Sequence, residues 1–280
     1  MNIAFWSNAY EKSGVFLNMA AVSIAGVIRY PYRITVLENY LDKNNLWNAF
    51  FVDNISVNRD KIINFYEGKG IEGLLRRIYR GDKEPSILKY YWRPVIPKHL
   101  YYIPQNGVIN SELFDYELYY NFHDLLDIIQ KNTDLCYFNI NPRNYLSSKA
   151  ILQEADLVVI NLYQDADYLK DFFSKYSSLI PKSVFIVGNY SPKSVLSCKR
   201  IARLYDIPLE DIAPIPYNED FYIACKHGSA KEFINRYYLC DKENPNYLFI
   251  HGIRKAAYII SQKAERNFAL AKKGMESCGF

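Results

Sequence analysis

Short apolar runs alternate with stretches of helical periodicity along most of the chain. The runs are compact and uninterrupted, which is typical of strands that are buried on both faces of a parallel sheet. Between the runs, apolar residues recur every three or four positions, as they do along the buried face of a helix. The expected strands are residues 3–5, 34–37, 100–103, 135–138, 156–162, 183–188 and 212–216; the expected helices are residues 18–25, 71–79, 116–131, 147–153, 166–176, 194–205 and 255–272.

This alternation predicts an α/β fold, a doubly wound and mostly parallel sheet that is flanked by helices. At 280 residues, the chain is long enough for one large α/β domain or two small ones. Since no internal repeat, low-complexity segment or interdomain linker divides it, we expect residues 1–280 to form a single domain. Residues 47–66 indicate an aromatic helix followed by a loop.

Composition narrows the class of protein. The lysines and arginines are spread along the chain, and a net charge of +4 is too small to indicate a nucleic-acid-binding protein. Five cysteines without a C-x-x-C pair, and no signal peptide, favour a reduced, cytoplasmic protein. No stretch approaches the roughly 18 continuous apolar residues of a membrane span. With 26 tyrosines and 12 glycines, the chain is a poor match to an enzyme with several glycine-rich nucleotide loops.

The turn between the first strand and the first helix is the stretch where chemistry is expected. A strand, a turn and a helix N-terminus form the geometry on which phosphate-binding loops are built. Such a loop is rich in glycine and carries a lysine followed by a hydroxyl residue. Here the sequence from 8 to 17 is NAYEKSGVFL, which keeps Gly14 but has Val15 and Phe16 in place of the lysine and the hydroxyl. The geometry of the loop is therefore expected, and most of its chemistry is missing.

Further polar residues follow the expected strands, at the carboxyl edge where α/β folds bind ligands. Glu38, Asn139 and Asn189 each come directly after a buried run. Asn189 is equally suited to a ligand contact or to a local turn, and Glu38 to a ligand contact or a surface position. Asn139 belongs to a segment that has turn character. Lys12 either leans over a phosphate or is an ordinary solvated side chain.

Several segments, in this order, resemble the ParA/MinD family of deviant Walker ATPases. The likeness is greatest to its TadZ/CpaE branch, which is similar to MinD and helps to position the Tad-type pilus machinery. It extends over roughly residues 1–265, and residues 55–130 fit it least and are treated as insertion-like. The resemblance implies a P-loop NTPase-like fold of the SIMIBI/MinD type. The segments are the N-terminal strand and turn, residues 135–142, ADLVVINLYQ at 155–164, GNY at 188–190 and IPYN at 215–218.

In that family, ATP and Mg²⁺ are held at a dimer interface. Transferred by position, the signature lysine of the loop falls at Tyr10, and two glycines fall at Glu11 and Lys12. The second lysine falls at Val15 and the metal-binding hydroxyl at Phe16. Losing both lysines removes the cations on which phosphoryl transfer depends.

The acidic positions of the family are only partly kept. Glu38 retains the acid after the second strand, whereas the next acidic position falls at Tyr40. The Walker B aspartate falls at Asn139, and an amide cannot supply the charge that holds magnesium through water. The adenine-contacting asparagine matches Asn189, which is present. ATP hydrolysis is therefore not expected.

Three functions from different classes follow. The leading hypothesis is a degenerate, TadZ/CpaE-like pseudo-ATPase that acts by protein–protein contact as a scaffold or positioning component, in Tad-type pilus assembly. It implies protein partners and a homodimer, with no cofactor, nucleic acid or membrane. The alternatives are an ATPase that binds ATP and Mg²⁺ through backbone amides and a lysine, and a Rossmann-like enzyme for another small ligand. The candidate ligand-binding residues are Lys12, Ser13, Gly14, Glu38, Asn139, Asn189 and Pro216, with no catalytic or metal-ligating residue assigned.

Overall fold

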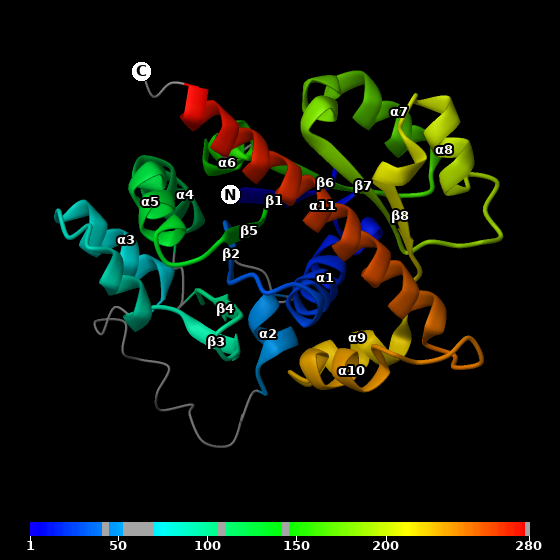
Figure 1. Cartoon of the computed structure of the whole chain (residues 1–280), viewed down its shortest axis with the longest axis horizontal. Coiled ribbons are helices and arrows are strands. Elements are labelled where there is room, and N and C mark those ends of the chain that lie inside the picture. Colours follow the sequence, from blue (N-terminus) through cyan, green and yellow to red (C-terminus); the bar gives the residue numbers. More distant parts are fainter. Residues whose placement is uncertain (41–44, 53–69, 106–109, 142–145, 278–280) are drawn as a thin grey trace.

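The structure is a computed structural model of the 280-residue chain. It describes the backbone of residues 1–40, 45–52, 70–105, 110–141 and 146–277, with side chains to residue 269. Within these ranges the molecule has helices on both sides of one central sheet (Figure 1). None of the described helices combines the length and the apolar character that a membrane span requires.

The sheet confirms the expected doubly wound α/β architecture. Its eight described strands lie in the order β3-β4-β2-β5-β1-β6-β7-β8, so the N-terminal strand is near the centre. Every neighbouring pair is parallel except β3 and β4, which are antiparallel. The bounds are β1 (Asn2–Trp6), β2 (Ile34–Glu38), β3 (Arg93–Ile96), β4 (Leu100–Tyr102), β5 (Leu135–Asn139), β6 (Leu157–Leu162), β7 (Ser183–Gly188) and β8 (Ile212–Ile215).

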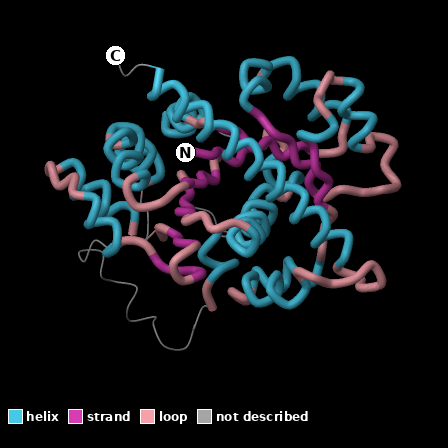
Figure 2. Tube along the Cα trace, in the orientation of Figure 1, coloured by secondary structure: helices cyan, strands magenta, loops and turns pink. Residues whose placement is uncertain are grey.

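The helices form two layers, one on each face of the sheet, and each layer packs on the sheet through its own hydrophobic core. The strands alternate their side chains between the faces, so residues such as Phe5 join one core and Ala4 the other. Figure 2 shows the strands as a band that runs between these layers. The first core holds α1 (Val15–Arg29), α2 (Leu46–Phe50), α9 (Glu219–Lys226), α10 (Ala230–Tyr237) and α11 (Tyr247–Ser277). The second holds α3 (Ile71–Tyr79), α4 (Ser111–Tyr120), α5 (Phe122–Gln130), α6 (Leu146–Glu154), α7 (Ala166–Lys175) and α8 (Cys198–Leu204).

Several expected helix boundaries are wrong. The helix expected over 116–131 is two helices, because the chain changes direction at Asn121, whose side chain donates to the Glu117 carbonyl at 2.8 Å. The helix expected from residue 194 begins after Ser197, whose hydroxyl caps the Arg200 amide at 3.3 Å. The closing helix begins at Tyr247 rather than at residue 255. Helices α9 and α10 were not expected.

The two strands at the edges of the sheet share an unusual feature. β3 was not expected, since only Val95 is buried in it and Arg93 and Pro94 are exposed. β8 forms the opposite edge and contains Pro214. Each described edge of the sheet therefore carries one proline, a residue that cannot donate to a ladder hydrogen bond.

The aromatic segment that precedes β3 packs largely across the sheet edge. Trp92 stacks on Tyr101 of the neighbouring strand, with 4.0 Å between ring centres. Tyr90 remains 66% exposed. Of the aromatic stretch at 47–66, α2 accounts for the helical start, and residues 53–66 lie outside the described ranges.

Candidate functional site

The turn between β1 and α1 is a short 3₁₀ turn, η1 (Tyr10–Ser13), and Gly14 follows it with φ +64°. Two of its backbone amides bond to carbonyls of the same segment. The Lys12 amide donates to the Ala9 carbonyl at 3.0 Å, and the Gly14 amide donates to the Glu11 carbonyl at 3.3 Å. A phosphate-binding loop instead aims its amides at the anion. In this turn, the Lys12 and Gly14 amides therefore donate to carbonyls of the chain, where the amides of a phosphate loop would donate to the ligand.

Ser13 and its neighbours fasten the turn to the sheet. The fully buried Ser13 hydroxyl donates to the Tyr10 carbonyl at 2.8 Å, so it does not face outward as a ligand-binding hydroxyl would. Gly188 at the end of β7 lets the Ser13 carbonyl approach closely, because a Cβ there would lie 1.8 Å from that oxygen. The Asn18 amide group donates to the same carbonyl at 3.2 Å and to the Asn161 side chain at 2.9 Å.

Asn189 covers the turn. It adopts φ +46°, a conformation that asparagine tolerates better than most residues. Its side-chain amide donates to the Lys12 carbonyl at 2.8 Å. A Cβ added to Gly14 would lie 3.1 Å from the Asn189 Oδ1 atom. The structure thus brings together Lys12, Ser13, Gly14 and Asn189, four of the seven candidate residues, with the Asn189 side chain lying over the glycine.

The Lys12 ammonium points toward α7. It lies 4.8 Å from the ring centre of Tyr168, and hydrogen bonding to this tyrosine raises the pKa of the exposed lysine. A lysine ammonium over an aromatic ring in this way forms a cation–π contact. The cation of the turn is therefore held by a neighbouring helix.

Glu38 and Asn139 form a second, buried cluster. The Glu38 carboxylate is 1% exposed and accepts from the Leu46 amide at 3.0 Å and the Tyr102 hydroxyl at 2.9 Å. Asn139 donates to Glu38 at 3.1 Å and to the Tyr40 hydroxyl at 2.7 Å. Burial, and then the charge of Glu38, hold the pKa of Tyr102 well above its ordinary range. The expected surface reading of Glu38 is wrong: this carboxylate is a buried acceptor that ties β2 to its neighbours.

Two tyrosine rings join the turn to the buried Glu38–Asn139 cluster. Tyr10 of the turn and Tyr40 contact each other edge to face, with 5.8 Å between ring centres. Pro216, the remaining candidate residue, follows β8 and is half-buried; among the described residues it forms no hydrogen bond with either cluster. The Asn139 Oδ1 atom is buried without a hydrogen-bond partner in the described part of the chain.

A small pocket of about 200 Å³ opens beside the turn and the start of α1. Its lining contains no lysine, arginine or histidine, and Glu11 contributes a negative charge. An anion would meet no positive side chain there and one repulsive carboxylate. The lining residues are Tyr10, Glu11, Gly14, Val15, Phe16, Leu17 and Tyr222.

Solved structures share the fold of this chain. The ParA family ATPase from Chlorobium tepidum TLS aligns with a TM-score of 0.67 at 15% identity, over 92% of this chain and 98% of that one. The cell division ATPase MinD from Pyrococcus furiosus aligns with a TM-score of 0.65 at 14% identity, over 93% and 98%. The chain has the ParA/MinD fold. No protein-family model matches the sequence, and no curated protein matches it.

The ParA/MinD fold raises the question of ATP and Mg²⁺, because a MinD from Pyrococcus horikoshii was solved with Mg-ADP (TM-score 0.62, 13% identity, 91% and 93% covered). The residues of this chain do not fit that group. The Lys12 and Gly14 amides bond within the turn, and the adjoining pocket has no cation. Mg²⁺ prefers free carboxylates, whereas Glu38 already accepts hydrogen bonds from three residues.

Four residues of the site were missed in the sequence. Asn161 carried a signal, because it is the one polar residue inside the buried run of β6. Asn18 carried a similar one, as a polar residue on the buried face of α1. Gly188 and Tyr102 gave none, since their roles depend on which strands lie side by side.

Proposed function

We propose that this ParA/MinD-fold protein does not hydrolyse ATP and acts as a scaffold that positions partner proteins by direct contact. The observation that carries the proposal is the turn at Tyr10–Gly14, where the Lys12 and Gly14 amides bond to nearby carbonyls beside a pocket that is lined by no lysine, arginine or histidine. Phosphoryl transfer depends on positioned donors and cations that stabilise the transferred phosphate. Removing a single such donor costs about 10²–10³ in rate, and here several are lost together.

The finer part of the proposal is a homodimer that takes part in Tad-type pilus assembly. Its support is the resemblance of the segments around the turn and strand ends to the TadZ/CpaE branch. A complex of MinC with MinD from Aquifex aeolicus (TM-score 0.64, 14% identity, 93% and 96% covered) is an example of this fold with another protein bound. A chain that keeps the fold while losing nucleotide chemistry can retain such contacts.

Calorimetry and thermal unfolding with ATP and Mg²⁺ test the first part. ATP at 100 times its dissociation constant would stabilise the protein by about 2.7 kcal/mol, which unfolding detects readily. We expect neither heat of binding nor thermal stabilisation at millimolar ATP. Mg²⁺-dependent turnover that is abolished by Gly14→Val, but not by Gly81→Val at an exposed turn remote from the site, would overturn the proposal.

The pilus assignment has its own tests. We expect genes for pilus secretion components beside the gene for this chain. We also expect the purified protein to sediment as a dimer without nucleotide. Unrelated neighbouring genes would contradict the pilus role while leaving the scaffold role intact, and a monomer would contradict the homodimer alone.

A further inference from the structure

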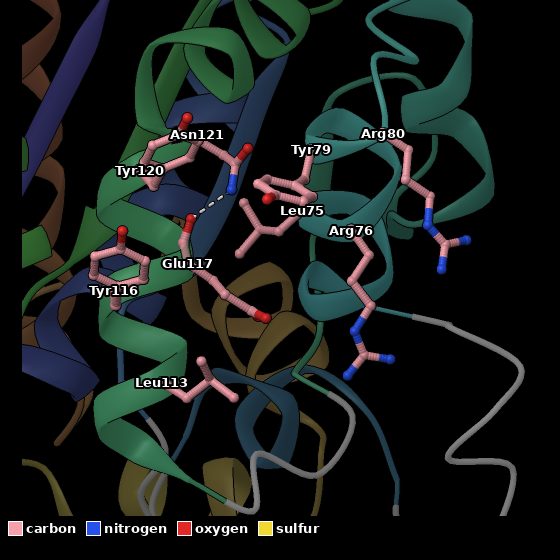
Figure 3. A pocket seen from close by; sticks show the side chains of 9 residues that line it. All are labelled: Leu75, Arg76, Tyr79, Arg80, Leu113, Tyr116, Glu117, Tyr120 and Asn121. Atoms are coloured by element: carbon pink, nitrogen blue, oxygen red, sulfur yellow. Dashed lines mark hydrogen bonds between the residues drawn. The ribbon is translucent and has the colours of Figure 1, made fainter.

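A groove of about 380 Å³ lies between α3 and α4, on the opposite face of the sheet from α1. Figure 3 shows its two helical walls and the side chains that line it. Asn121, where α4 ends, closes one end of the groove. The wall from α3 consists of Leu75, Arg76, Tyr79 and Arg80, and the wall from α4 consists of Leu113, Tyr116, Glu117 and Tyr120.

Helix α4 is apolar on two sides, and only one of them is covered. Phe114 and Leu118 are buried in the core beneath the helix. Leu113, Tyr116 and Tyr120 recur at the spacing of a single helix face, yet they are 54%, 54% and 63% exposed. A helix normally buries such a stripe, and a cluster of exposed apolar side chains marks an interaction site.

The tyrosines of the groove are already arranged against one another. Tyr116 and Tyr120 lie with nearly parallel rings, 6.2 Å apart between centres. Tyr79 reaches across from α3 and lies 6.0 Å from Tyr120. Ordered aromatic side chains lose little entropy when a partner covers them, which is why tyrosine and arginine dominate the energetics of protein interfaces.

Charge indicates the nature of the occupant. Arg76 and Arg80 lie one helical turn apart and are exposed, and among the described residues neither forms an ion pair. The intervening Arg77 instead pairs with Asp82. Two unpaired guanidinium groups along one wall favour carboxylates, which arginine binds with two parallel hydrogen bonds.

Other occupants fit these observations less well. Glu117 extends from α4 toward α3 (Figure 3), so negative charge is favoured only along the α3 wall, beside the arginines. A helix with carboxylates on one flank can meet this condition, whereas a nucleic acid carries phosphates along its whole length. A second copy of this chain, seated groove to groove by two-fold symmetry, would offer one carboxylate, that of Glu117, to the two arginines. A helix with an apolar face and flanking carboxylates could cover the exposed stripe of Leu113, Tyr116 and Tyr120, which we call the tyrosine stripe, and also pair with the arginines of the α3 wall.

We infer that the α3–α4 groove binds a short, acidic amphipathic helix of a partner protein. Its apolar residues cover the tyrosine stripe, and its carboxylates pair with Arg76 and Arg80. This is the helix-in-groove mode of recognition, in which anchors at i, i+3 or i+4 and i+7 enter a groove. The inference rests on the proposed scaffold function and names the surface through which it acts.

A display selection tests the inference. A library of 16-residue helical peptides with fixed apolar anchors and randomised flanking positions is selected on the full chain. The selected peptides are then synthesised and titrated by fluorescence anisotropy. The groove variants are the double variant Arg76→Glu/Arg80→Glu and the single variant Tyr120→Ser; the matched controls are Arg203→Glu and Tyr90→Ser, at exposed positions outside the groove.

We expect the selected peptides to be rich in glutamate and aspartate. Each groove variant should weaken their binding by about tenfold or more, as loss of an interface hot spot does, and the controls should not. Peptides that bind both groove variants normally, or that are enriched in basic residues, would overturn the inference. It is also overturned if the groove variants abolish binding of a single-stranded oligonucleotide or dissociate a dimer of this chain.

The inference and the proposed function fail in different ways. ATP turnover by the wild-type protein, with peptide binding still confined to the groove, would contradict the scaffold proposal and leave the groove assignment standing. Peptides that bind elsewhere on a chain without turnover would contradict the groove assignment alone. Circular dichroism of each variant verifies that it remains folded.

Discussion

The turn at residues 10–14 and the groove between α3 and α4 differ in whether their side chains and amides are already paired within the chain. In the turn, polar groups that could meet a ligand are paired within the chain, as with the Lys12 amide and the Ser13 hydroxyl. In the groove, apolar rings face solvent and Arg76 has no ion-pair partner among the described residues. The ParA/MinD fold would lead one to look for binding at the turn, whereas the chemistry that is free for binding lies in the groove.

The contrast indicates that a chain can keep a fold while the loop that would bind a ligand in that fold takes a purely structural role. The turn still has a structural task, since Asn18, Gly188 and Asn189 use it to join α1 to the carboxyl edge of the sheet. We therefore expect substitutions around the turn to lower stability, and those in the groove to alter binding with little effect on stability.

The largest effect is expected at Gly188. An alanine Cβ would lie 1.8 Å from the Ser13 carbonyl oxygen, so Gly188→Ala forces the turn away from the sheet. We expect the free energy of unfolding in urea to fall by about 3 kcal/mol, within the range of overpacked sites. The matched control is Gly26→Ala inside α1, where the nearest atom is 3.8 Å away. It should stabilise the helix by about 0.5–1 kcal/mol; equal effects of the two would refute the close approach.

The next effect is expected at Tyr102. Tyr102→Phe removes a hydrogen bond to the buried Glu38 carboxylate and should cost about 2 kcal/mol at neutral pH. The pKa of Tyr102 is raised in the folded protein, so its contribution is complete below the unfolded pKa of 10.0 and is lost as pH rises above it. Urea unfolding between pH 7 and 11 should show a steeper loss of stability in the wild type than in Tyr102→Phe. The exposed control Tyr119→Phe should keep the wild-type slope.

The smallest effect on stability is expected in the groove. Tyr116 and Tyr120 are more than half exposed, so Tyr116→Ser and Tyr120→Ser should each change the free energy of unfolding by less than about 0.5 kcal/mol. Thermal unfolding measures this difference directly. A loss comparable to that of Gly188→Ala would mean that these rings hold the helices together, and the contrast between the two regions would disappear.

Most of the fold could be predicted from the sequence, because its strands are buried on both faces and appear as continuous apolar runs. β3 escaped notice since Arg93 and Pro94 at the sheet edge interrupt any such run. The break at Asn121 also escaped, because apolar spacing continues through Leu118, Phe122 and Leu125 while a local hydrogen bond ends the helix. The spacing of apolar residues predicts which side chains are buried, but it does not predict where a side-chain hydrogen bond ends a helix.

The candidate site was predictable only in part. Position at a strand end predicted that Glu38, Asn139 and Asn189 lie at the carboxyl edge of the sheet. The structure brings Asn189 beside Gly14, and Glu38 beside Asn139. The ligand-binding role assigned to these residues stays a prediction. The contacts of the Ser13 carbonyl with Asn18 and Gly188 could not be foreseen, because they depend on the β1-β6-β7 order of the sheet. Neither could the groove, whose walls are separated by more than thirty residues of chain.

The prolines at the two borders of the sheet limit how this protein can assemble. Pro94 and Pro214 each withhold a main-chain donor from any strand that would extend the sheet outward. Growth by strand addition, the usual route to fibrils and to β-mediated pairing, is discouraged at both borders. Contacts with other molecules are thereby directed to the helical surfaces.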